Sequence, residues 1–213
     1  MIQINRTAKP TYLAAREVNW LKELRNARKS GDKAKFKRLQ AKYGHTKIRD
    51  ALAEIFKSKC AYCESTIEVV ASPHIEHFRP KQRYVSLTYC WENLLLSCPR
   101  CNDGGHKGTQ FPNQLQSGPL VDPSVEDPLV HFDFVYDPVT RLATVKPITT
   151  RGQKSATIFG LNTRPALIKA RSELLRQLLA LKKFDGEDPE VTEVLAAARQ
   201  ATSPYLAWVN KYI

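Results

Sequence analysis

Four cysteines stand in two pairs whose spacing is typical of a zinc site. The pairs are Cys60-x-x-Cys63 and Cys98-x-x-Cys101, and 34 residues separate them. Two such pairs favour a closed tetrahedral Zn²⁺ site over a redox motif, since a reducing cytosol disfavours disulfides. Four thiolates leave no open coordination position, so this zinc would be structural. Plain burial of the thiols is the alternative, and it suits Cys90 better because Cys90 has no partner at ligand spacing.

The stretch between the two cysteine pairs carries groups suited to phosphodiester hydrolysis. That reaction needs a base that activates water and positive charge at the scissile phosphate. His77 suits the base because an unperturbed imidazole accepts a proton near neutral pH. Glu76 offers a carboxylate and Asn102 an amide oxygen, the hard ligands that Mg²⁺ or Mn²⁺ prefers. His106, four residues after Asn102, is an alternative third ligand.

The adjacency of Glu76 and His77 places a condition on the strand that carries them. Neighbouring residues of a regular strand face opposite sides, so both side chains reach one phosphate only if the strand ends, bulges or twists there. Pro80 shortly afterwards is consistent with an end. By the same alternation His74 shares a face with Glu76, where we expect a structural hydrogen bond rather than a phosphate or metal contact.

Three short motifs together resemble the HNH endonucleases: His-Ile-Glu-His-Phe-Arg-Pro, Trp-Glu-Asn-Leu and Cys-Pro-Arg-Cys-Asn. The resemblance implies two strands and a helix around one divalent metal. It also implies that Asn93, the middle letter of the motif, holds the loop carrying the base through backbone hydrogen bonds. The chain departs from the common pattern at Glu76, where Asp is usual, and at Asn102, where His is frequent.

The flanking pattern, Cys-Ala-Tyr-Cys-Glu and later Lys-Gly-Thr-Gln-Phe-Pro, looks like the HNH nuclease component of Septu-type and retron-associated anti-phage systems. This closer resemblance implies an ABC-type ATPase partner with coiled-coil character. The sequence has no GxxxxGK[ST] motif, so ATP binding would belong to that partner. DNA is the expected substrate. An RNA-cleaving (tRNA-cleaving) HNH nuclease and an inactive zinc-finger module that binds nucleic acid are the alternatives.

Positive charge is concentrated before the first cysteine. The net charge is +12, and residues 1–59 hold 16 Lys and Arg against 5 Asp and Glu. Such a segment attracts phosphate backbones without regard to sequence, although a solvated helix face is the simpler explanation. The expected nucleic-acid contacts are basic residues of this arm and of the stretch between and after the cysteine pairs: Lys33, Lys35, Lys37, Arg38, Arg79, Lys81, Arg100 and Lys107.

The elements that position these groups form an α+β fold: a mostly helical chain wrapped around a ββα-metal (HNH) finger with a four-cysteine zinc knuckle. Apolar spacing and breakers predict helices over 12–29, from Asp32 to about Tyr43, and from a Thr46 cap to the first cysteine. Strands are expected at 131–136 and 142–145, and helices at 165–183, 189–201 and 204–212. The predicted parts are a basic helical arm (1–59), the nuclease module (60–112) and a hairpin-and-helix region (113–213).

Several classes of protein are excluded or disfavoured. The 42% hydrophobic and 25% charged residues are within the globular range and argue against a disordered chain. No apolar run approaches a membrane span, and the first residues lack the apolar segment of a secretory signal. The sequence therefore predicts a cytoplasmic protein with no membrane partner. The leucine-rich C-terminal helices could dock the partner or complete the protein's own core, and the sequence leaves both open.

Overall fold

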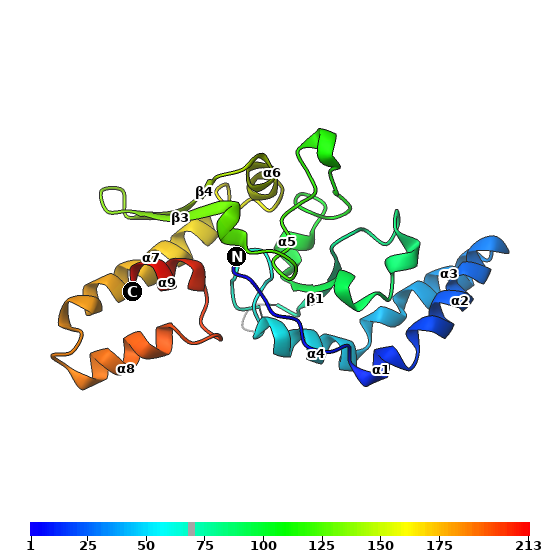
Figure 1. Ribbon diagram of the computed structural model, residues 1–213, viewed down its shortest axis with the longest axis horizontal. Helices are drawn as coiled ribbons and strands as arrows, with labels where there is room; N and C mark the ends of the chain where they lie inside the picture. Colours follow the sequence, from blue (N-terminus) through cyan, green and yellow to red (C-terminus); the bar gives the residue numbers. More distant parts are fainter. Residues whose placement is uncertain (68–70) are drawn as a thin grey trace.

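Two antiparallel β-hairpins and nine α-helices form the part of the chain that the computed structural model describes, residues 1–67 and 71–213 (Figure 1). The first hairpin pairs β1 (His74–His77) with β2 (Leu94–Ser97). The second pairs β3 (Phe132–Asp137) with β4 (Leu142–Pro147). The molecule is elongated, with the first hairpin near its middle (Figure 1). The predicted α+β class is confirmed.

Four helices precede the first cysteine: α1 (Thr11–Ala14), α2 (Glu17–Lys29), α3 (Lys33–Gln40) and α4 (Thr46–Phe56). The helix expected over 12–29 is broken between α1 and α2. Leu13 is buried in the core while Val18 is exposed, so these two residues do not form one buried stripe. Thr46 is the first helical residue rather than the cap. His45 is extended there, and its Nδ1 accepts the backbone N–H of Lys47.

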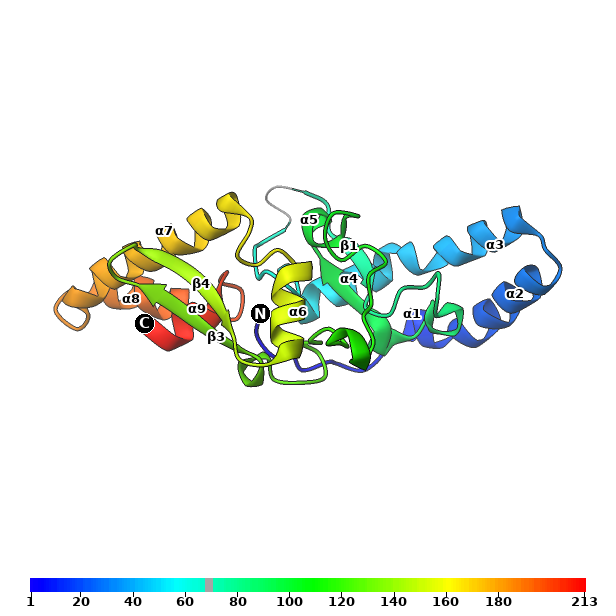
Figure 2. The ribbon, with the colours of Figure 1, turned by 90° about the horizontal axis from the view of Figure 1, so that it is seen from above.

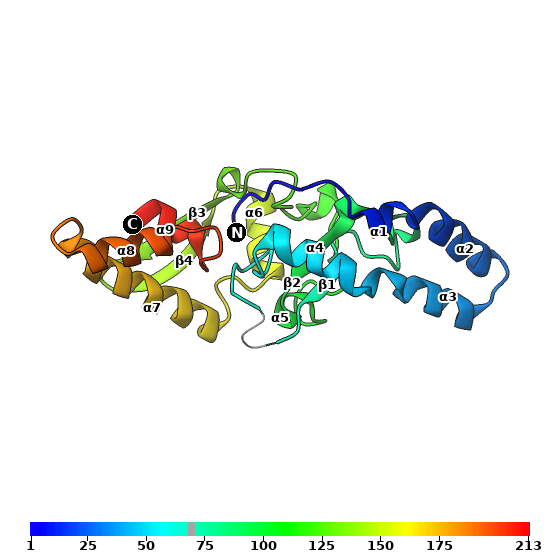
Figure 3. The same cartoon turned by 90° about the horizontal axis from the view of Figure 1, so that it is seen from below.

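Helices α2 and α3 form a helical hairpin that projects from one end of the molecule, away from strands β1 and β2 (Figure 3). A 3₁₀ turn (Ala41–Gly44) joins α3 to the segment before α4. Helix α4 then packs its apolar side, Ile48, Leu52, Ile55 and Phe56, beneath β2. The arm also contacts the segment between β1 and β2, because Trp20 of α2 packs on Tyr89 and the Tyr89 hydroxyl donates to the Leu39 carbonyl of α3 at 2.6 Å.

The finger consists of β1, β2 and the short helix α5 (Pro99–Asn102). Trp91 and the three leucines of β2 are buried, as the sequence predicts for core residues. Cys90 differs from expectation: it is only half-buried, and its Sγ donates to Glu92 Oε2 at 3.1 Å. The polar partner and the solvent contact explain why this thiol does not behave as a small core hydrophobe.

The C-terminal region holds α6 (Thr150–Ile158), α7 (Pro165–Leu181), α8 (Pro189–Ala198) and α9 (Leu206–Tyr212). Pro165 opens α7, as predicted. The sequence does not predict helix α6, because this segment is largely polar, but Thr149 caps it by accepting the Gly152 N–H. Short 3₁₀ turns complete the described elements: Val85–Leu87, Trp91–Asn93, Gln114–Gln116, Pro128–Val130 and Lys182–Phe184.

The leucine face of α7 is used inside the protein. Leu178 packs with Leu195 of α8 and with Leu206 and Val209 of α9. Figure 2 shows α7, α8 and α9 gathered beside the second hairpin. Of the two roles that the sequence left open for this face, completing the protein's own core is the one found. A second, larger core cluster includes residues from all three predicted parts, among them Leu24 and Trp91. The three-part division itself stays a prediction.

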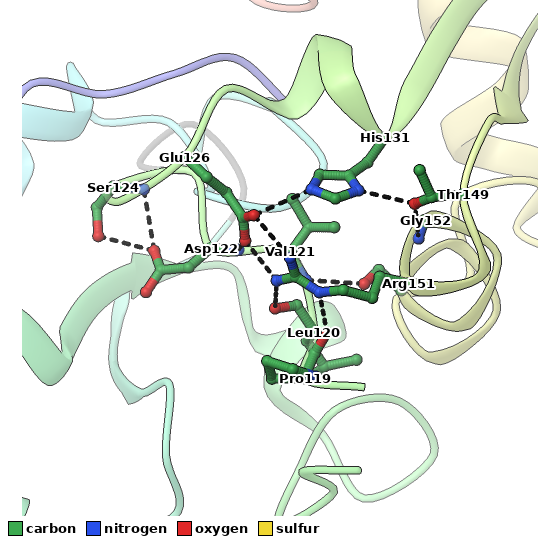
Figure 4. Close-up of polar contacts among 11 residues, drawn as sticks. Pro119, Leu120, Val121, Asp122, Ser124, Glu126, His131, Thr149, Arg151 and Gly152 are labelled. Carbon is green, nitrogen blue, oxygen red and sulfur yellow. Dashed lines mark hydrogen bonds and ion pairs between the residues drawn. The ribbon is translucent and has the colours of Figure 1, made fainter. Parts of the chain in front are cut away.

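A polar network holds the loop that follows the finger against the start of α6 (Figure 4). The Glu126 carboxylate accepts both terminal nitrogens of Arg151, at 2.8 and 2.6 Å, and lies 3.0 Å from His131 Nε2. The other ring nitrogen of His131 is 2.7 Å from the Thr149 hydroxyl. Gly152 packs so closely on the His131 carbonyl that a Cβ would lie 2.2 Å from its oxygen.

Among the described residues, no helix is long and apolar enough to cross a membrane.

Candidate active site

Glu76, His77 and Asn102 line one cavity of about 250 Å³. Strand β1 carries the first two residues and α5 carries the third. Tyr43, from the 3₁₀ turn of the N-terminal arm, and Lys81 lie in the wall of the same cavity. Three segments far apart in the chain thus meet at this place, and the polar groups that they bring are a carboxylate, an imidazole, an amide, a phenol and an ammonium.

His77 presents one ring nitrogen to a backbone carbonyl, and the other has no hydrogen-bond partner among the described residues. Its Nε2 lies 2.9 Å from the carbonyl oxygen of Thr88. A carbonyl only accepts, so Nε2 carries the hydrogen and Nδ1 keeps its lone pair in the neutral ring. Burial lowers the pKa of His77 to about 3, against the opposing effect of the Thr88 contact. The ring is therefore neutral at physiological pH, with one basic nitrogen available.

The sequence requires β1 to end, bulge or twist near Glu76 and His77 if both side chains are to reach one phosphate. The register is regular up to the last pair, His77 with Leu94, and β1 ends at His77. Glu76 and His77 nevertheless line the same cavity. The expected end of the strand is confirmed at this residue.

Asn93 ties the loop after His77 to the loop before β2. Its Oδ1 accepts the backbone N–H of Arg79 at 2.8 Å. Its Nδ2 donates to the carbonyl oxygens of Arg79 at 3.0 Å and of Leu87 at 3.3 Å. Leu87 immediately precedes Thr88, whose carbonyl receives the His77 ring. One buried amide thus joins the two segments that set the orientation of the imidazole.

Lys107 is fully buried and pairs with the Glu76 carboxylate. Its Nζ also donates to the carbonyl oxygen of His77 at 3.0 Å. Burial raises the pKa of Glu76 and lowers that of Lys107, while the attraction between the two charges opposes both shifts. The sequence suggested that Lys107 contacts phosphate. The structure places its ammonium inside the finger, beneath the cavity, where it is not exposed to a nucleic acid.

The donor set at the cavity fits a hard divalent cation. Glu76 Oε1 is buried and forms an ion pair with the Lys107 ammonium. The Asn102 amide lines the same cavity, and two protein oxygens with room for water are what Mg²⁺ or Mn²⁺ commonly takes. His106 does not reach this cavity. It lies 2.9 Å from Asp103 Oδ1 and lines a separate cavity of about 860 Å³ beside the cysteine cluster.

His74 lies near the cavity but not in its wall. Its Nδ1 is 3.4 Å from the Asn102 side-chain nitrogen, and the ring is exposed. The contact is long and solvent-exposed, and the structural hydrogen bond expected for His74 stays a prediction.

The four paired cysteines form the cluster that their spacing predicts. Their Sγ atoms all lie within 4.8 Å of one another, and Cys63 Sγ is 3.9 Å from Cys98 Sγ. Tetrahedral thiolates at about 2.3 Å from zinc would be about 3.8 Å apart, so the cluster fits this metal. Arg164 Nη1 donates to Cys101 Sγ at 3.4 Å. If the four thiolates held one Zn²⁺, this cation would offset the negative charge that remains.

The remaining predicted nucleic-acid contacts lie at several distances from the cavity. Lys81 lines it and donates to the Tyr43 hydroxyl at 3.1 Å. Arg79 is exposed over the Phe111 ring, and Arg100 points into solvent beside the other cavity. The four basic residues of α3 are exposed on the projecting hairpin: Lys33, Lys35, Lys37 and Arg38.

Three groups at the two sites escaped sequence analysis. Tyr43 packs edge-on against the His77 ring, with 4.4 Å between ring centroids. Thr88 contributes a carbonyl, which no side-chain pattern reveals. Arg164 lies 63 residues beyond its cysteine partner. A basic residue before a helix-opening proline is too common a signal to have identified it.

Comparison with known proteins agrees with this geometry. A family model described as HNH endonuclease matches residues 60–108, which contain both cysteine pairs and the cavity residues of the finger. The chain is 30% identical over 211 residues to the Septu protein PtuB of Bacillus mycoides (strain KBAB4), covering 86% of this chain and 70% of that protein. It is 39% identical over 90 residues to the Septu protein PtuB of Bacillus thuringiensis, covering 42% of this chain and 33% of that protein. With its nuclease domain and this extent of similarity, the chain belongs to the HNH endonuclease family that includes the Septu protein PtuB.

Proposed function

We propose that this nuclease hydrolyses phosphodiester bonds of DNA with the help of Mg²⁺ or Mn²⁺, as the effector of an anti-phage defence system. The observation that carries the proposal is the cavity where Glu76, His77 and Asn102 meet, inside the stretch that matches the HNH model. An inactive zinc-binding module would have no need for a neutral, oriented imidazole beside a buried carboxylate.

His77 is the general base in this proposal. Its Nδ1 accepts the proton of the attacking water, while Thr88 and Asn93 keep the ring oriented. The imidazolium that forms is next to Glu76 in the chain and lines the same cavity, so the Glu76 carboxylate offsets its positive charge. Because the resting ring is neutral, no proton has to leave it before the reaction begins.

Glu76 and Asn102 are the residues that would hold the catalytic divalent ion. That ion supplies positive charge at the scissile phosphate and at the leaving oxygen. Lys107 keeps Glu76 ionised against the burial that raises its pKa, and so maintains a charged ligand. Lys81, in the wall of the cavity, is placed to contact a phosphate oxygen directly.

The zinc in this proposal is structural. Cys60 and Cys63 lie at the entry to the finger, Cys98 caps α5 and Cys101 lies within it, so the metal would join the segments that flank both strands. It would thereby set the position of α5, and with it Asn102, relative to β1. A finger of this size gains much of its stability from such a cross-link.

The arm supports the substrate class. Helix α3 exposes four cations on a hairpin that extends from the same side of the molecule as α4 (Figure 3). None of these four cations lines the cavity, and a group of charges outside it suits a long polyanion rather than a small phosphate ester. Duplex DNA is the proposed substrate, and RNA is the competing outcome of the cleavage test below.

An ABC-type ATPase is the proposed partner, in the cytoplasm. The support is the similarity to a Septu protein together with a sequence that lacks a P-loop motif. Because the leucine face of α7 is covered by α8 and α9, docking would use another surface.

The test is a cleavage panel with the purified chain, alone and co-purified with its ATPase partner. Plasmid DNA, single-stranded DNA and tRNA are each incubated with Mg²⁺ or Mn²⁺ and with EDTA. His77→Ala is expected to abolish cleavage while leaving zinc content and melting temperature close to wild type. His106→Ala is the matched control, since it removes a histidine that does not reach the cavity. Wild-type turnover by His77→Ala would overturn the proposed mechanism, and preferential cleavage of tRNA would replace DNA as the substrate.

A further inference from the structure

A second hollow lies directly beside the catalytic cavity. Its volume is about 300 Å³, and its wall contains Arg49 from α4 and His74 from β1. It shares three wall residues with the catalytic cavity: Tyr43, Ile75 and Asn102. The two hollows are therefore neighbours along one surface, separated only by the side chains that they share.

The second hollow is positive and offers unused donors. Arg49 Nε is buried without a hydrogen-bond partner among the described residues, and its Nη2 makes only a long bond, 3.4 Å, to the Gly44 carbonyl. No ion pair of Arg49 is found in residues 1–67 and 71–213. Among the residues that the structure describes, none in the wall of this hollow carries a carboxylate. Leaving a guanidinium N–H buried and unpaired costs free energy, which a bound anion would recover.

The chemistry of the walls selects the kind of anion. A guanidinium presents planar, forked donors that match two oxygens of a phosphate. His74 adds an exposed imidazole, and Tyr43 adds an aromatic ring whose centroid lies 4.8 Å from Lys81 Nζ. A phosphodiester group with a sugar next to it fits this combination.

We propose that the hollow lined by Arg49 and His74 binds the phosphate next to the scissile one on the cleaved strand. This inference rests on the proposed nuclease function. The strand would cross the shared wall at Asn102 and Tyr43, with the scissile phosphate near Lys81 and its neighbour at Arg49. Arg49 is a substrate-binding residue in this scheme. It positions the strand so that the scissile phosphate meets His77, and it takes no part in proton transfer.

The first test compares two substrates that differ in their number of phosphates. Bis(p-nitrophenyl) phosphate has a single phosphodiester and cannot fill the second hollow, whereas a duplex oligonucleotide fills both. Arg49→Gln is expected to raise KM for the oligonucleotide about 10- to 100-fold, the size expected for removal of a charge-assisted hydrogen bond. Its kcat/KM for bis(p-nitrophenyl) phosphate should stay within about twofold of wild type. Arg176→Gln on α7 is the matched control, because it removes the same charge from an exposed site outside both hollows.

The second test changes the substrate, so its first comparison is made on wild-type protein and does not depend on the folding of a variant. A single neutral methylphosphonate replaces the phosphate on one side or the other of the mapped cleavage site. With the methylphosphonate at one of these two positions, wild type should lose activity. The loss should be as large as the loss that Arg49→Gln shows on the natural strand. Arg49→Gln should lose little more at that position, since the variant no longer has the guanidinium that would bind this phosphate.

The outcomes separate the two proposals. Independent, additive losses at both neighbouring phosphates, or equal KM values for Arg49→Gln and Arg176→Gln, would overturn the second subsite and leave the nuclease intact. A loss on bis(p-nitrophenyl) phosphate as large as the loss on the oligonucleotide would also overturn it, because Arg49 would then act on the site as a whole. Wild-type protein that hydrolyses neither substrate, with its partner present, would overturn the proposed function and the subsite together.

Discussion

Asn102 and His106 stand four residues apart, yet they line different cavities. Helix α5 ends at Asn102, which keeps this side chain beside β1, within 3.4 Å of His74. The chain then turns, and His106 packs against Asp103 and Gly160 instead. The choice of a third metal ligand therefore depends on where a helix of four residues ends. Both residue types could bind a metal, and of the two Asn102 is the one that lines the cavity of Glu76.

Asn102→Ala is expected to weaken Mg²⁺ or Mn²⁺ binding, since it removes one of two protein oxygens at the proposed ion. Isothermal titration of the zinc-loaded protein should show a Kd raised about 10-fold or more, and raised Mn²⁺ should restore part of the cleavage. His106→Ala should leave this Kd unchanged. If His106→Ala weakened metal binding and Asn102→Ala did not, the ligand assignment would be reversed.

Among the elements, the finger is a short hairpin and a single helical turn held at both ends by cysteines. Strands of four residues bury few side chains, and β1 and β2 pair only with each other. Their register depends on neighbours: α4 beneath β2, the Arg6 guanidinium on the carbonyl oxygens of Trp91 and Leu94, and the cysteine cluster. We therefore expect the metal to contribute much of the local stability.

Cys60→Ser should release the zinc and destabilise the finger. Structural zinc is worth on the order of 10 kcal/mol of apparent binding free energy, comparable with the whole stability of a domain. Cys90→Ser is the matched control and should keep the metal, since its Sγ donates to Glu92 and is not part of the four-cysteine cluster. Native mass spectrometry should find one zinc per chain in wild type and in Cys90→Ser. Zinc-free wild-type protein that folds normally would contradict the four-thiolate site.

The α2–α3 hairpin should govern affinity for nucleic acid without affecting the chemistry. We expect that changing four exposed cations of α3 to Glu weakens DNA binding and flattens its salt dependence: Lys33, Lys35, Lys37 and Arg38. For every phosphate that the arm no longer neutralises, the slope of log K against log salt should fall by about 0.9 on duplex DNA. Fluorescence anisotropy at several salt concentrations measures this slope.

A control with the same change in net charge lies at the other end of the molecule. The four cations for that variant are exposed on or after α7: Lys169, Arg176, Lys182 and Lys183. The two variants should differ in salt slope although their net charges are equal. Equal slopes would mean that the arm does not touch phosphate and that only overall charge matters.

Across the molecule as a whole, folding itself should be coupled to the protonation of His77. The folded state lowers the pKa of this buried imidazole to about 3, whereas the unfolded chain titrates near 6.5. Below pH 6.5 the unfolded state binds a proton at His77 that the folded state does not bind. This contribution to the free energy of unfolding is therefore fully present above pH 6.5 and falls as the pH decreases towards 3. Between pH 7.5 and 5 the loss from this group is about 2 kcal/mol.

Comparison with His77→Gln isolates this effect from the other titrating groups. Glutamine keeps a donor for the Thr88 carbonyl but does not titrate. Burial raises the pKa of Glu76, which acts in the opposite direction and is present in both proteins. Urea denaturation at pH 7.5 and at pH 5, without added Mg²⁺ or Mn²⁺, should show that wild type loses about 2 kcal/mol more than the variant. Parallel losses would mean that His77 titrates normally in the folded protein.

Features that depend on local spacing and residue type could be predicted from the amino-acid sequence. The two cysteine pairs, the strand that ends at His77, the buried face of α4 and the opening of α7 at Pro165 all follow from short patterns. The HNH resemblance has the same origin, since its motifs are short runs of neighbouring residues. Local spacing constrains the backbone within a few residues, so these predictions agree with the structure.

The set of side chains that meet at the cavity depends instead on tertiary packing. Tyr43 reaches His77 from 34 positions away in the chain, and the carbonyl of Thr88 orients the imidazole from a separate loop. Lys107, which the sequence suggested as a surface contact, is buried against Glu76 because the turn after α5 folds beneath β1. Contacts between distant segments depend on how the elements pack, and the energy of burying a charge depends on the partners that packing supplies. Neither quantity is encoded in the spacing of residues along the chain.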